Sequence, residues 1–350
     1  MIRNILICTT QVPFTKGGAE SHVEGLRSAL IEAGYRAEIV ALPFKWYPPG
    51  EIMRGALAWR MLDLTAANGQ PVDLVIGMKF PAYLVAHERK VLWILHQHRS
   101  AYNLWGTPFD DLSTYPEGVR VREWIKHCDE RFIPEARKVF ANSKAVADRL
   151  KRYNNIESEP LYHPPPLADQ LRTGEQGDYI FYPSRLEPQK RQELLIEAAQ
   201  HLRSPLKVVL AGGSGNLKHY EELIKKNGVG NRVTIRGFVS EQEMVELYAN
   251  ALGVCYFPFD EDYGYVTLEG MLAAKPVVVA RDSGGAAEFI EHEHNGLIVE
   301  PDPRAIADAF DRLHHDRAWA LQLGSRARDK IIEMDLSWPR VVERLISGAG

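Results

Sequence analysis

Two acidic residues enclose the segment of the sequence that is most suited to chemistry. Glu261 and Glu269 flank a loop containing Gly264, which follows an apolar strand-like run and leads into a helical stretch. Carboxylates can accept hydrogen bonds from sugar hydroxyls, the glycine allows a ligand close to the backbone, and a helix start suits a diphosphate. Two solvated acids at a helix start are the alternative, since acids are favoured there.

A second polar loop carries two cations. Arg185 and Lys190 also lie between a strand-like run, residues 179–183, and a helical stretch. An arginine can bind phosphate bidentately and a lysine adds a point charge. Together they could offset the charge that builds up on a departing nucleotide diphosphate. A solvated basic loop remains the alternative.

One short motif suggests a metal instead. Asp260-Glu261-Asp262 matches the Asp-x-Asp pattern, whose hard oxygen ligands suit magnesium or manganese. Such a three-residue match is common by chance, and Arg185 and Lys190 could neutralise the phosphates. We therefore expect no metal and no other cofactor.

The bulk properties exclude several classes of protein. A length of 350 residues predicts about two domains, and a net charge of −4 argues against a nucleic-acid-binding protein. Cys8, Cys128 and Cys255 are far apart and predict neither a disulfide framework nor a metal site. No signal-peptide pattern and no run of 18 apolar residues is present. A cytoplasmic location is expected.

The elements that must position these residues alternate along the chain. Strand-like runs occur at 5–8, 37–42, 73–77 and 91–95, and again at 207–211, 232–236, 253–257 and 276–280. Helical stretches between them, such as 19–33, 192–201, 219–226, 241–249 and 266–274, predict an α/β fold with parallel sheets.

A proline-rich segment interrupts this alternation and indicates a domain boundary. Pro164, Pro165 and Pro166 begin a spacer that ends in a polar run. We expect one domain at 1–165, joined by a C-terminal helix at 335–350, and a second at 166–334. Ligands of such folds bind beyond the carboxyl ends of the strands, so a cleft between the domains is expected to hold the site.

The motifs together resemble glycosyltransferase family 4. The sequence has a Glu-x7-Glu pair, a basic loop and an early Gly-Gly-Ala-Glu loop starting at Gly17. Further similarities are Ala211-Gly212-Gly213-Ser214-Gly215, Gly237-Phe238-Val239, the stretch 284–288 and Asn295-Gly296-Leu297. The resemblance implies a GT-B architecture of two facing Rossmann-like domains.

The resemblance also implies the roles of individual residues. His96, Glu261, Arg185 and Lys190 are expected to be catalytic, with His96 near the reacting sugar. The expected donor-binding residues are Gly17, Gly18, Gly212, Gly213, Gly264, Tyr265, Val266 and Glu269, with Glu269 on the ribose hydroxyls. His98 and Arg99 are secondary candidates. The implied reaction moves a hexose from a nucleotide-diphosphate sugar, with retention, to a glycan or lipid-linked acceptor in polysaccharide biosynthesis.

Two departures from the family pattern affect the sugar pocket. Asp262 and Tyr263 replace the usual Gly-Phe pair, and Gly270 stands where alanine is common. UDP-glucose is our preferred donor, followed by GDP-mannose. A nucleotide-sugar epimerase of the same architecture and a non-catalytic nucleotide-sugar binder are alternative functions.

The first half of the chain has one further feature. The stretch from Phe44 to Arg60 contains both aromatic and basic residues. Such a stretch could contact the inner face of a membrane peripherally, or it could pack its aromatics onto the first domain, which we favour.

An oxidoreductase is not indicated, since no Gly-x-Gly-x-x-Gly fingerprint opens a helix.

Overall fold

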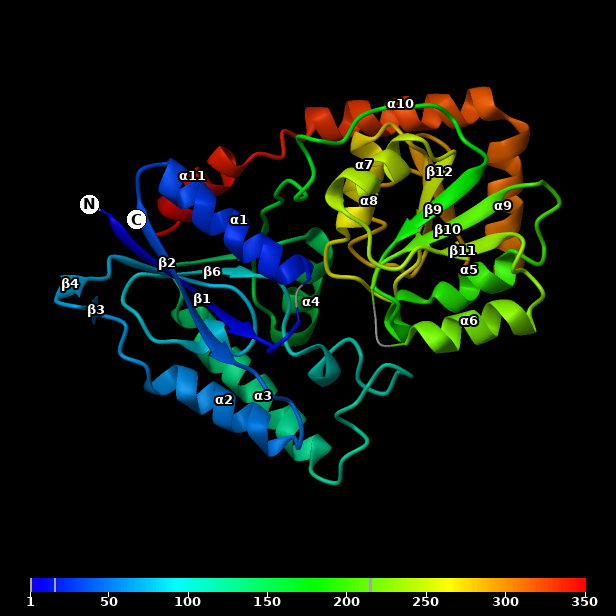
Figure 1. Cartoon of the computed structure of the whole chain (residues 1–350). Coiled ribbons are helices and arrows are strands. Elements are labelled where there is room, and N and C mark those ends of the chain that lie inside the picture. The colour runs from blue at the N-terminus through cyan, green and yellow to red at the C-terminus, as the bar shows by residue number, and fades with distance from the viewer. Residues whose placement is uncertain (1, 16, 214–215) are drawn as a thin grey trace. The chain divides into compact units, whose positions relative to one another are not determined.

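The chain divides into two compact units, which are described separately here. The computed structural model describes residues 2–15, 17–213 and 216–350 (Figure 1). Unit 1 is Met1–Pro166 together with Ser337–Gly350, and unit 2 is Leu167–Leu336. Each unit contains one parallel sheet of six strands, which confirms the expected α/β class.

The sheet of unit 1 has the strand order β2-β1-β5-β6-β7-β8. Every neighbouring pair in it is parallel. Its strands are β1 (Asn4–Gln11), β2 (Arg36–Pro43), β5 (Leu74–Gly77), β6 (Lys90–Ile94), β7 (Lys138–Ala141) and β8 (Glu159–Pro160). A small antiparallel pair, β3 (Ala66–Ala67) and β4 (Gln70–Pro71), lies outside this sheet.

Helices cover both faces of the unit 1 sheet. They are α1 (Gly18–Glu32), α2 (Gly50–Met61), α3 (Gly118–Phe132), α4 (Lys144–Asn154) and α11 (Trp338–Ser347), with short 3-10 turns η1 (Ala82–Leu84), η2 (Arg99–Ala101) and η3 (Ile133–Glu135). Successive strand residues point to opposite faces. Trp93 therefore packs in the cluster that contains α1 and α11, whereas Leu92 and Ile94 pack with α2 and α3. Figure 1 shows α1 and α11 on one side of this sheet and α2 and α3 on the other.

The C-terminal helix α11 completes the core of unit 1. Val341 and Leu345 are fully buried against the sheet and α1. Trp338 lies over Gly25 of α1, where an added Cβ would be 2.4 Å from the indole ring. The absence of a side chain at position 25 thus leaves the space that the indole occupies.

The sheet of unit 2 has the order β11-β10-β9-β12-β13-β14, again parallel throughout. Its strands are β9 (Tyr179–Pro183), β10 (Lys207–Ala211), β11 (Val233–Ile235), β12 (Gly253–Tyr256), β13 (Val277–Ala280) and β14 (Gly296–Val299). Its helices are η4 (Pro188–Lys190), α5 (Gln192–Ala198), α6 (Leu217–Lys226), α7 (Glu241–Ala249), α8 (Tyr265–Leu272), α9 (Pro303–His315) and α10 (Arg317–Glu333). Figure 1 shows α5 and α6 on one side of this sheet and α7 and α8 on the other.

The sequence-based boundaries agree with most of these elements. The helix expected at 241–249 is α7, whose start is fixed by Ser240, since its Oγ accepts a 3.2 Å hydrogen bond from the Glu243 amide. The helix expected at 192–201 ends earlier, at Ala198, because residues 199–201 form a turn. None of the described helices is long and apolar enough to cross a membrane.

Candidate functional site

The expected donor residues of unit 2 gather where the strand order reverses. Strand β9 continues through α5 to β10 on one side, and β12 continues through α8 to β13 on the other, while β9 and β12 are neighbours. Such a reversal opens a crevice at the carboxyl ends of the strands. Arg185 and Lys190 follow β9, and Glu261 and Gly264 follow β12.

Lys190, Tyr256 and Glu261 form a hydrogen-bonded triangle at this point. The Lys190 ammonium donates to the Tyr256 hydroxyl at 2.9 Å and forms an ion pair with Glu261 Oε2. The Tyr256 hydroxyl donates to the same carboxylate oxygen at 2.8 Å. The Lys190 and Glu261 side chains are 16% and 15% exposed, so this charge pair is poorly screened by water. The structure thus brings together two of the four expected catalytic residues.

Tyr256 is a member of this triangle that the sequence analysis missed. Burial, together with the negative charge of Glu261, raises the pKa of its phenol well above the ordinary value, so the hydroxyl stays protonated. It is the last residue of β12, and that position at the carboxyl edge is the signal that could have identified it.

Arg185 is more loosely held than Lys190. Its Nη1 lies 2.9 Å from Glu187 Oε1, and both side chains are more than a third exposed. Such a surface pair contributes little to stability, so a phosphate could compete for the guanidinium. The Arg185 carbonyl accepts a 2.7 Å hydrogen bond from Gln192 Nε2, which anchors the loop backbone.

Arg191 has a structural role, unlike its neighbour Lys190. It adopts a left-handed conformation with a φ of 53° just before α5. Its guanidinium makes two hydrogen bonds to the Asp282 carboxylate, at 2.8 and 2.6 Å, and others to the carbonyls of Phe257 and Pro258. Arg191 therefore links the loops that follow β9, β12 and β13.

Glycines bring two of these loops into direct backbone contact. Gly264 has a φ of 83°, and an added Cβ would be 2.7 Å from the Cβ of Ala286. At Gly285, an added Cβ would be 2.4 Å from the Asp262 carbonyl oxygen. The close contact fixes the start of α8, where Tyr265 and Val266 lie. The expected donor-binding residues Gly264, Tyr265 and Val266 are thus contiguous with Glu261.

Glu269 lies one turn into α8. The Tyr248 hydroxyl donates a 2.5 Å hydrogen bond to its Oε2. Burial raises the pKa of Glu269 to about 7, although the Tyr248 hydrogen bond opposes that rise. A Cβ at Gly270 would be 2.8 Å from Val277 Cγ2, so the glycine that departs from the family pattern lets α8 lie close to the strands.

The glycine-rich loop after β10 is adjacent to the Arg185 loop. Gly212 has a φ of 151°, and a Cβ there would be 2.1 Å from the Ser184 carbonyl oxygen. A Cβ at Gly213 would meet no atom within 4 Å. The remaining residues of this motif, Ser214 and Gly215, lie outside the described residues.

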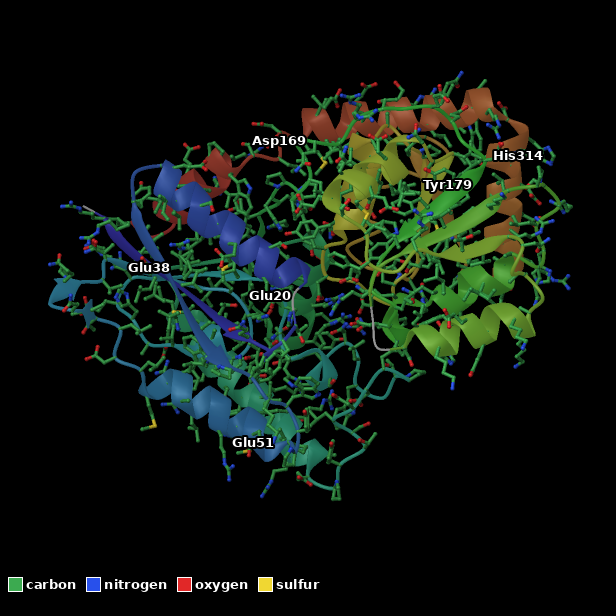
Figure 2. The ribbon with its side chains drawn as sticks, viewed as in Figure 1. Glu20, Glu38, Glu51, Asp169, Tyr179 and His314 are labelled. Atoms are coloured by element: carbon green, nitrogen blue, oxygen red, sulfur yellow. The ribbon has the colours of Figure 1, made fainter. Side chains whose placement is uncertain are left out.

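In unit 1, the Gly-Gly-Ala-Glu loop is held by its own glutamate. Glu20 Oε2 accepts a 2.9 Å hydrogen bond from the Gly17 amide, and Glu20 Oε1 lies 3.3 Å from Lys79 Nζ. Gly18 is the first residue of α1, and Figure 2 labels Glu20 near this end of the helix. The buried Lys79 follows β5, the neighbour of β1, and was not identified from the sequence.

His96 follows β6 at the same edge of that sheet and is half-buried. Its Nδ1 donates a 2.8 Å hydrogen bond to the Gln97 carbonyl, which places the proton on Nδ1. His98 is buried against Phe44 and Phe80, and burial lowers its pKa to about 4. His98 is thus a neutral side chain of the unit 1 core.

The aromatic stretch after β2 mostly packs inward. Trp59 is 1% exposed, and Phe44 and Trp46 pack against the cluster beneath α2 and α3. Tyr47 is half exposed, and Leu57 and Met61 of α2 are exposed.

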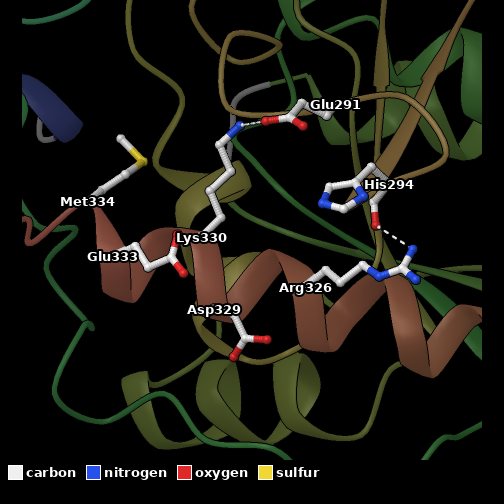
Figure 3. Close-up of a pocket in the computed structure, with 7 residues that line it drawn as sticks. All are labelled: Glu291, His294, Arg326, Asp329, Lys330, Glu333 and Met334. Carbon is white, nitrogen blue, oxygen red and sulfur yellow. Dashed lines mark hydrogen bonds and ion pairs between the residues drawn. The ribbon is translucent and has the colours of Figure 1, made fainter.

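A pocket lies elsewhere in unit 2. Figure 3 shows it between α10 and the loop that precedes β14. Its polar walls are tied by a 2.7 Å ion pair between Lys330 and Glu291. Residues just before β14 lie at the amino edge of the sheet, opposite the expected donor residues. Among the described residues, no three His, Cys, Asp or Glu side chains form a group that could hold a metal ion.

Comparisons with known proteins identify glycosyltransferases as relatives of this chain. A family model described as "Glycosyl transferases group 1" matches residues 166–330. An uncharacterized glycosyltransferase of Methanocaldococcus jannaschii is 35% identical, over 96% of this chain and 94% of the relative. A GDP-mannose-dependent alpha-(1-6)-phosphatidylinositol monomannoside mannosyltransferase of Mycobacterium tuberculosis is 32% identical, over 73% of this chain and 68% of the relative.

Solved structures extend the likeness of fold to the whole chain. The crystal structure of Anabaena HepE in complex with UDP and glucose has a TM-score of 0.70 at 20% identity, and covers 99% of this chain and 98% of its own.

Proposed function

Because the chain belongs to the glycosyl transferases of group 1 and has their GT-B fold, we propose that it is a retaining, metal-independent hexosyltransferase. Its donor is a nucleoside diphosphate sugar and its acceptor a glycan or a lipid-linked glycan. The observation that supports this proposal best is the triangle of Lys190, Tyr256 and Glu261 at the crevice of the unit 2 sheet.

The diphosphate is assigned to the cations of this crevice. Lys190 is buried enough for its charge to act strongly, and Arg185 can leave its exposed partner for a phosphate. The amino end of α8 offers backbone amide groups and a positive dipole end to the diphosphate. Gly264 has no side chain that would block the approach of the diphosphate to this end. These groups would stabilise the charge on the departing diphosphate.

Two carboxyl groups are assigned to hydroxyls of the donor. Glu269 would accept hydrogen bonds from the ribose, as the family resemblance implies. Glu261 would accept hydrogen bonds from the transferred sugar while Lys190 turns toward the diphosphate. The ion pair between Lys190 and Glu261 would then be exchanged for contacts with the two halves of the donor.

Retention requires that the acceptor approach the face from which the diphosphate leaves. The bond between the anomeric carbon and the diphosphate oxygen breaks, and a bond to the acceptor oxygen forms. The acceptor's proton passes to the departing phosphate oxygen. His96 is assigned a hydrogen bond with the transferred sugar, as the family resemblance implies, while its Nδ1 donates to the Gln97 carbonyl. No general base on the opposite face is required.

Among nucleotide sugars, the donors that we favour are UDP-glucose and then GDP-mannose. The sequence analysis favours the former, whereas the 32% identical mycobacterial relative is named for GDP-mannose. A thermal-shift panel of nucleotide sugars separates the two, since a ligand that binds the folded state raises the apparent stability. The preferred donor should raise the melting temperature at the lowest concentration.

Product analysis then tests the reaction. With the preferred donor, a glycan acceptor and excess EDTA, the product should be an α-glycoside, which the coupling constant of its anomeric proton identifies. A β-glycoside would make His96 a catalytic base, and a need for added manganese would favour the Asp260-Glu261-Asp262 interpretation. Interconversion of the donor without acceptor would indicate an epimerase, and binding without turnover a sensor.

A further inference from the structure

A buried carboxyl group beneath the His96 loop has no part in the function proposed so far. Asp129 lies in α3 and is 0% exposed. Its Oδ1 accepts a 2.9 Å hydrogen bond from the Tyr83 hydroxyl, and its Oδ2 accepts 2.8 Å hydrogen bonds from Gln97 Nε2 and the Tyr102 hydroxyl. All three partners are neutral. They come from η1, from the loop after β6 and from the turn after η2.

The network continues to a fourth element. Gln97 Nε2 also donates to Asn154 Oδ1 at 2.9 Å, and Asn154 Nδ2 donates to the Tyr102 hydroxyl at 3.2 Å. Both protons of the Gln97 amide are therefore committed. An amide flip at Gln97 would set its oxygen against the oxygens of Asp129 and Asn154, so the network permits only one orientation of this side chain.

Stability alone does not account for Asp129. Burying a carboxylate with no cation beside it costs free energy, and the three hydrogen bonds recover only part of that cost. Burial accordingly raises the pKa of Asp129 to about 7 despite these donors. Apolar residues of similar volume often replace buried charged groups without loss of stability. What an apolar residue cannot do is orient Gln97.

The orientation of Gln97 determines that of its neighbour. The Gln97 carbonyl accepts the Nδ1 proton of His96. The side-chain hydrogen bonds of Gln97 restrict the movement of its backbone, and so help to hold this carbonyl against the Nδ1–H of the His96 imidazole. If the side chain is released, the peptide can rotate and the hydrogen bond from His96 Nδ1 to the Gln97 carbonyl is weakened.

We infer that Asp129 is a positioning residue that fixes the orientation and tautomer of His96 through Gln97. The inference rests on the proposed role of His96 in sugar transfer. It adds to that role the buried carboxyl group that holds the loop in place.

Asp129→Leu tests the inference, because leucine is of similar size but accepts no hydrogen bond. We expect kcat to fall about tenfold or more, since small displacements of a reacting group have effects of that order. The affinity for the nucleoside diphosphate should change less than about twofold, since unit 2 holds the expected phosphate and ribose contacts. The signals of the His96 ring nitrogens should change in 15N spectra of histidine-labelled protein, assigned by comparison with His96→Ala.

Two further variants make the test specific. In Asp129→Asn, Oδ1 can accept from Gln97 and Tyr102 while Nδ2 donates to the Tyr83 hydroxyl, so most of the lost turnover should return. Gln97→Leu breaks the link itself and should match Asp129→Leu; the double variant should lose no more than either single one. If Asp129→Leu does not fold, the turnover and the His96 signals of Gln97→Leu test the inference without it.

Val121→Ala serves as the control for a mere loss of stability. Val121 is fully buried in the same helix and lies outside the network. It should lower the melting temperature with little change in kcat. The inference is wrong if Asp129→Leu folds with normal turnover and unchanged His96 signals, or if Asp129→Asn loses as much turnover as Asp129→Leu. If the wild-type protein transfers no sugar, the proposed function fails, while the 15N spectra still test the link to His96.

Discussion

Lys190 and Glu261, 71 positions apart in the sequence, form an ion pair and both bind the hydroxyl of Tyr256. The charges stabilise each other in a site with little access to water. A donor that takes over both contacts must supply a negative group to Lys190 and hydroxyls to Glu261. This relationship leads to the first prediction.

Lys190→Ala should lower kcat by about 10²-fold, as expected for the loss of one group that stabilises developing charge. Adding Arg185→Ala should lower it further. Steady-state kinetics with the preferred donor measures both effects. Lys218→Ala is the control, because Lys218 lies on α6 and its side chain is 89% exposed. Near-normal turnover of the double variant would show that the diphosphate binds elsewhere.

Glu269→Ala should weaken binding of the nucleoside diphosphate by about 1–3 kcal/mol, because the ribose hydroxyls lose a buried acceptor. Isothermal titration calorimetry with UDP and GDP measures the change. An unchanged affinity for both nucleotides would remove Glu269 from the donor site.

The same glutamate should make stability depend on pH. Its pKa of about 7 in the folded state lies above the ordinary value of 4.5, so it costs stability as pH rises from 4.5 through 7. Glu269→Gln should therefore be more stable relative to the wild type at pH 8 than at pH 5, by up to about 3 kcal/mol. Denaturant unfolding at the two pH values measures the difference, and equal differences would contradict the shift.

Two buried histidines in unit 1 should affect the pH dependence of stability in the opposite direction to Glu269, because they lower stability as pH falls. His22 and His163 stack with ring centroids 3.7 Å apart beside Trp93, and burial lowers the pKa of His22 from 6.5 to about 3 and that of His163 as well. As pH falls below 6.5, the unfolded chain takes up protons that the folded unit excludes. Stability should fall by about 1.4 kcal/mol per pH unit for each buried ring.

The variant His22→Leu isolates one of these rings. The pH dependence of its unfolding free energy between pH 6 and 4.5 should be flatter than that of the wild type by about one proton. His201→Gln is the control, because His201 is exposed. Asp129 contributes with the opposite sign, so only the difference from the wild type is informative. Parallel curves would show that His22 is protonated in the fold.

Gly264→Ala should reduce both stability and donor affinity. The substitution imposes strain at a φ of 83° and places a Cβ 2.7 Å from Ala286, which must displace the start of α8. Gly228→Ala is the matched control, with a φ of 67° and no atom within 4 Å of the added Cβ. The free energy of unfolding of the control should fall by only about 1 kcal/mol. That of Gly264→Ala should fall by clearly more. Equal losses would show that the contact with Ala286 is unimportant.

The sequence was sufficient to place Lys190 and Glu261 in loops that follow strands of the second unit. Both follow apolar strands, and the carboxyl ends of parallel strands share one edge. It could not assign different tasks to Lys190 and Arg191, which look alike as a basic pair. The left-handed backbone of Arg191 sends its side chain to Asp282, a partner 91 positions away.

The sequence also could not reveal that Asp129 is buried. It stands in a charged stretch of α3 and looks like any solvated helical acid. Its burial depends on the packing of α3 against α2 and the sheet, and its partners come from three other segments. The sequence also could not explain why glycine replaces alanine at position 270. The explanation is the short distance between α8 and Val277, which leaves no room for a side chain.

The return of the chain to unit 1 through α11 has a consequence for synthesis on the ribosome. Unit 2 is a continuous segment that can fold as soon as it emerges, whereas unit 1 needs Trp338, Val341 and Leu345 to close its core. The N-terminal segment, although made first, must wait with apolar surface exposed until the last helix arrives. Chaperones would therefore be expected to bind nascent unit 1, and a chain released before α11 is made would be prone to aggregation.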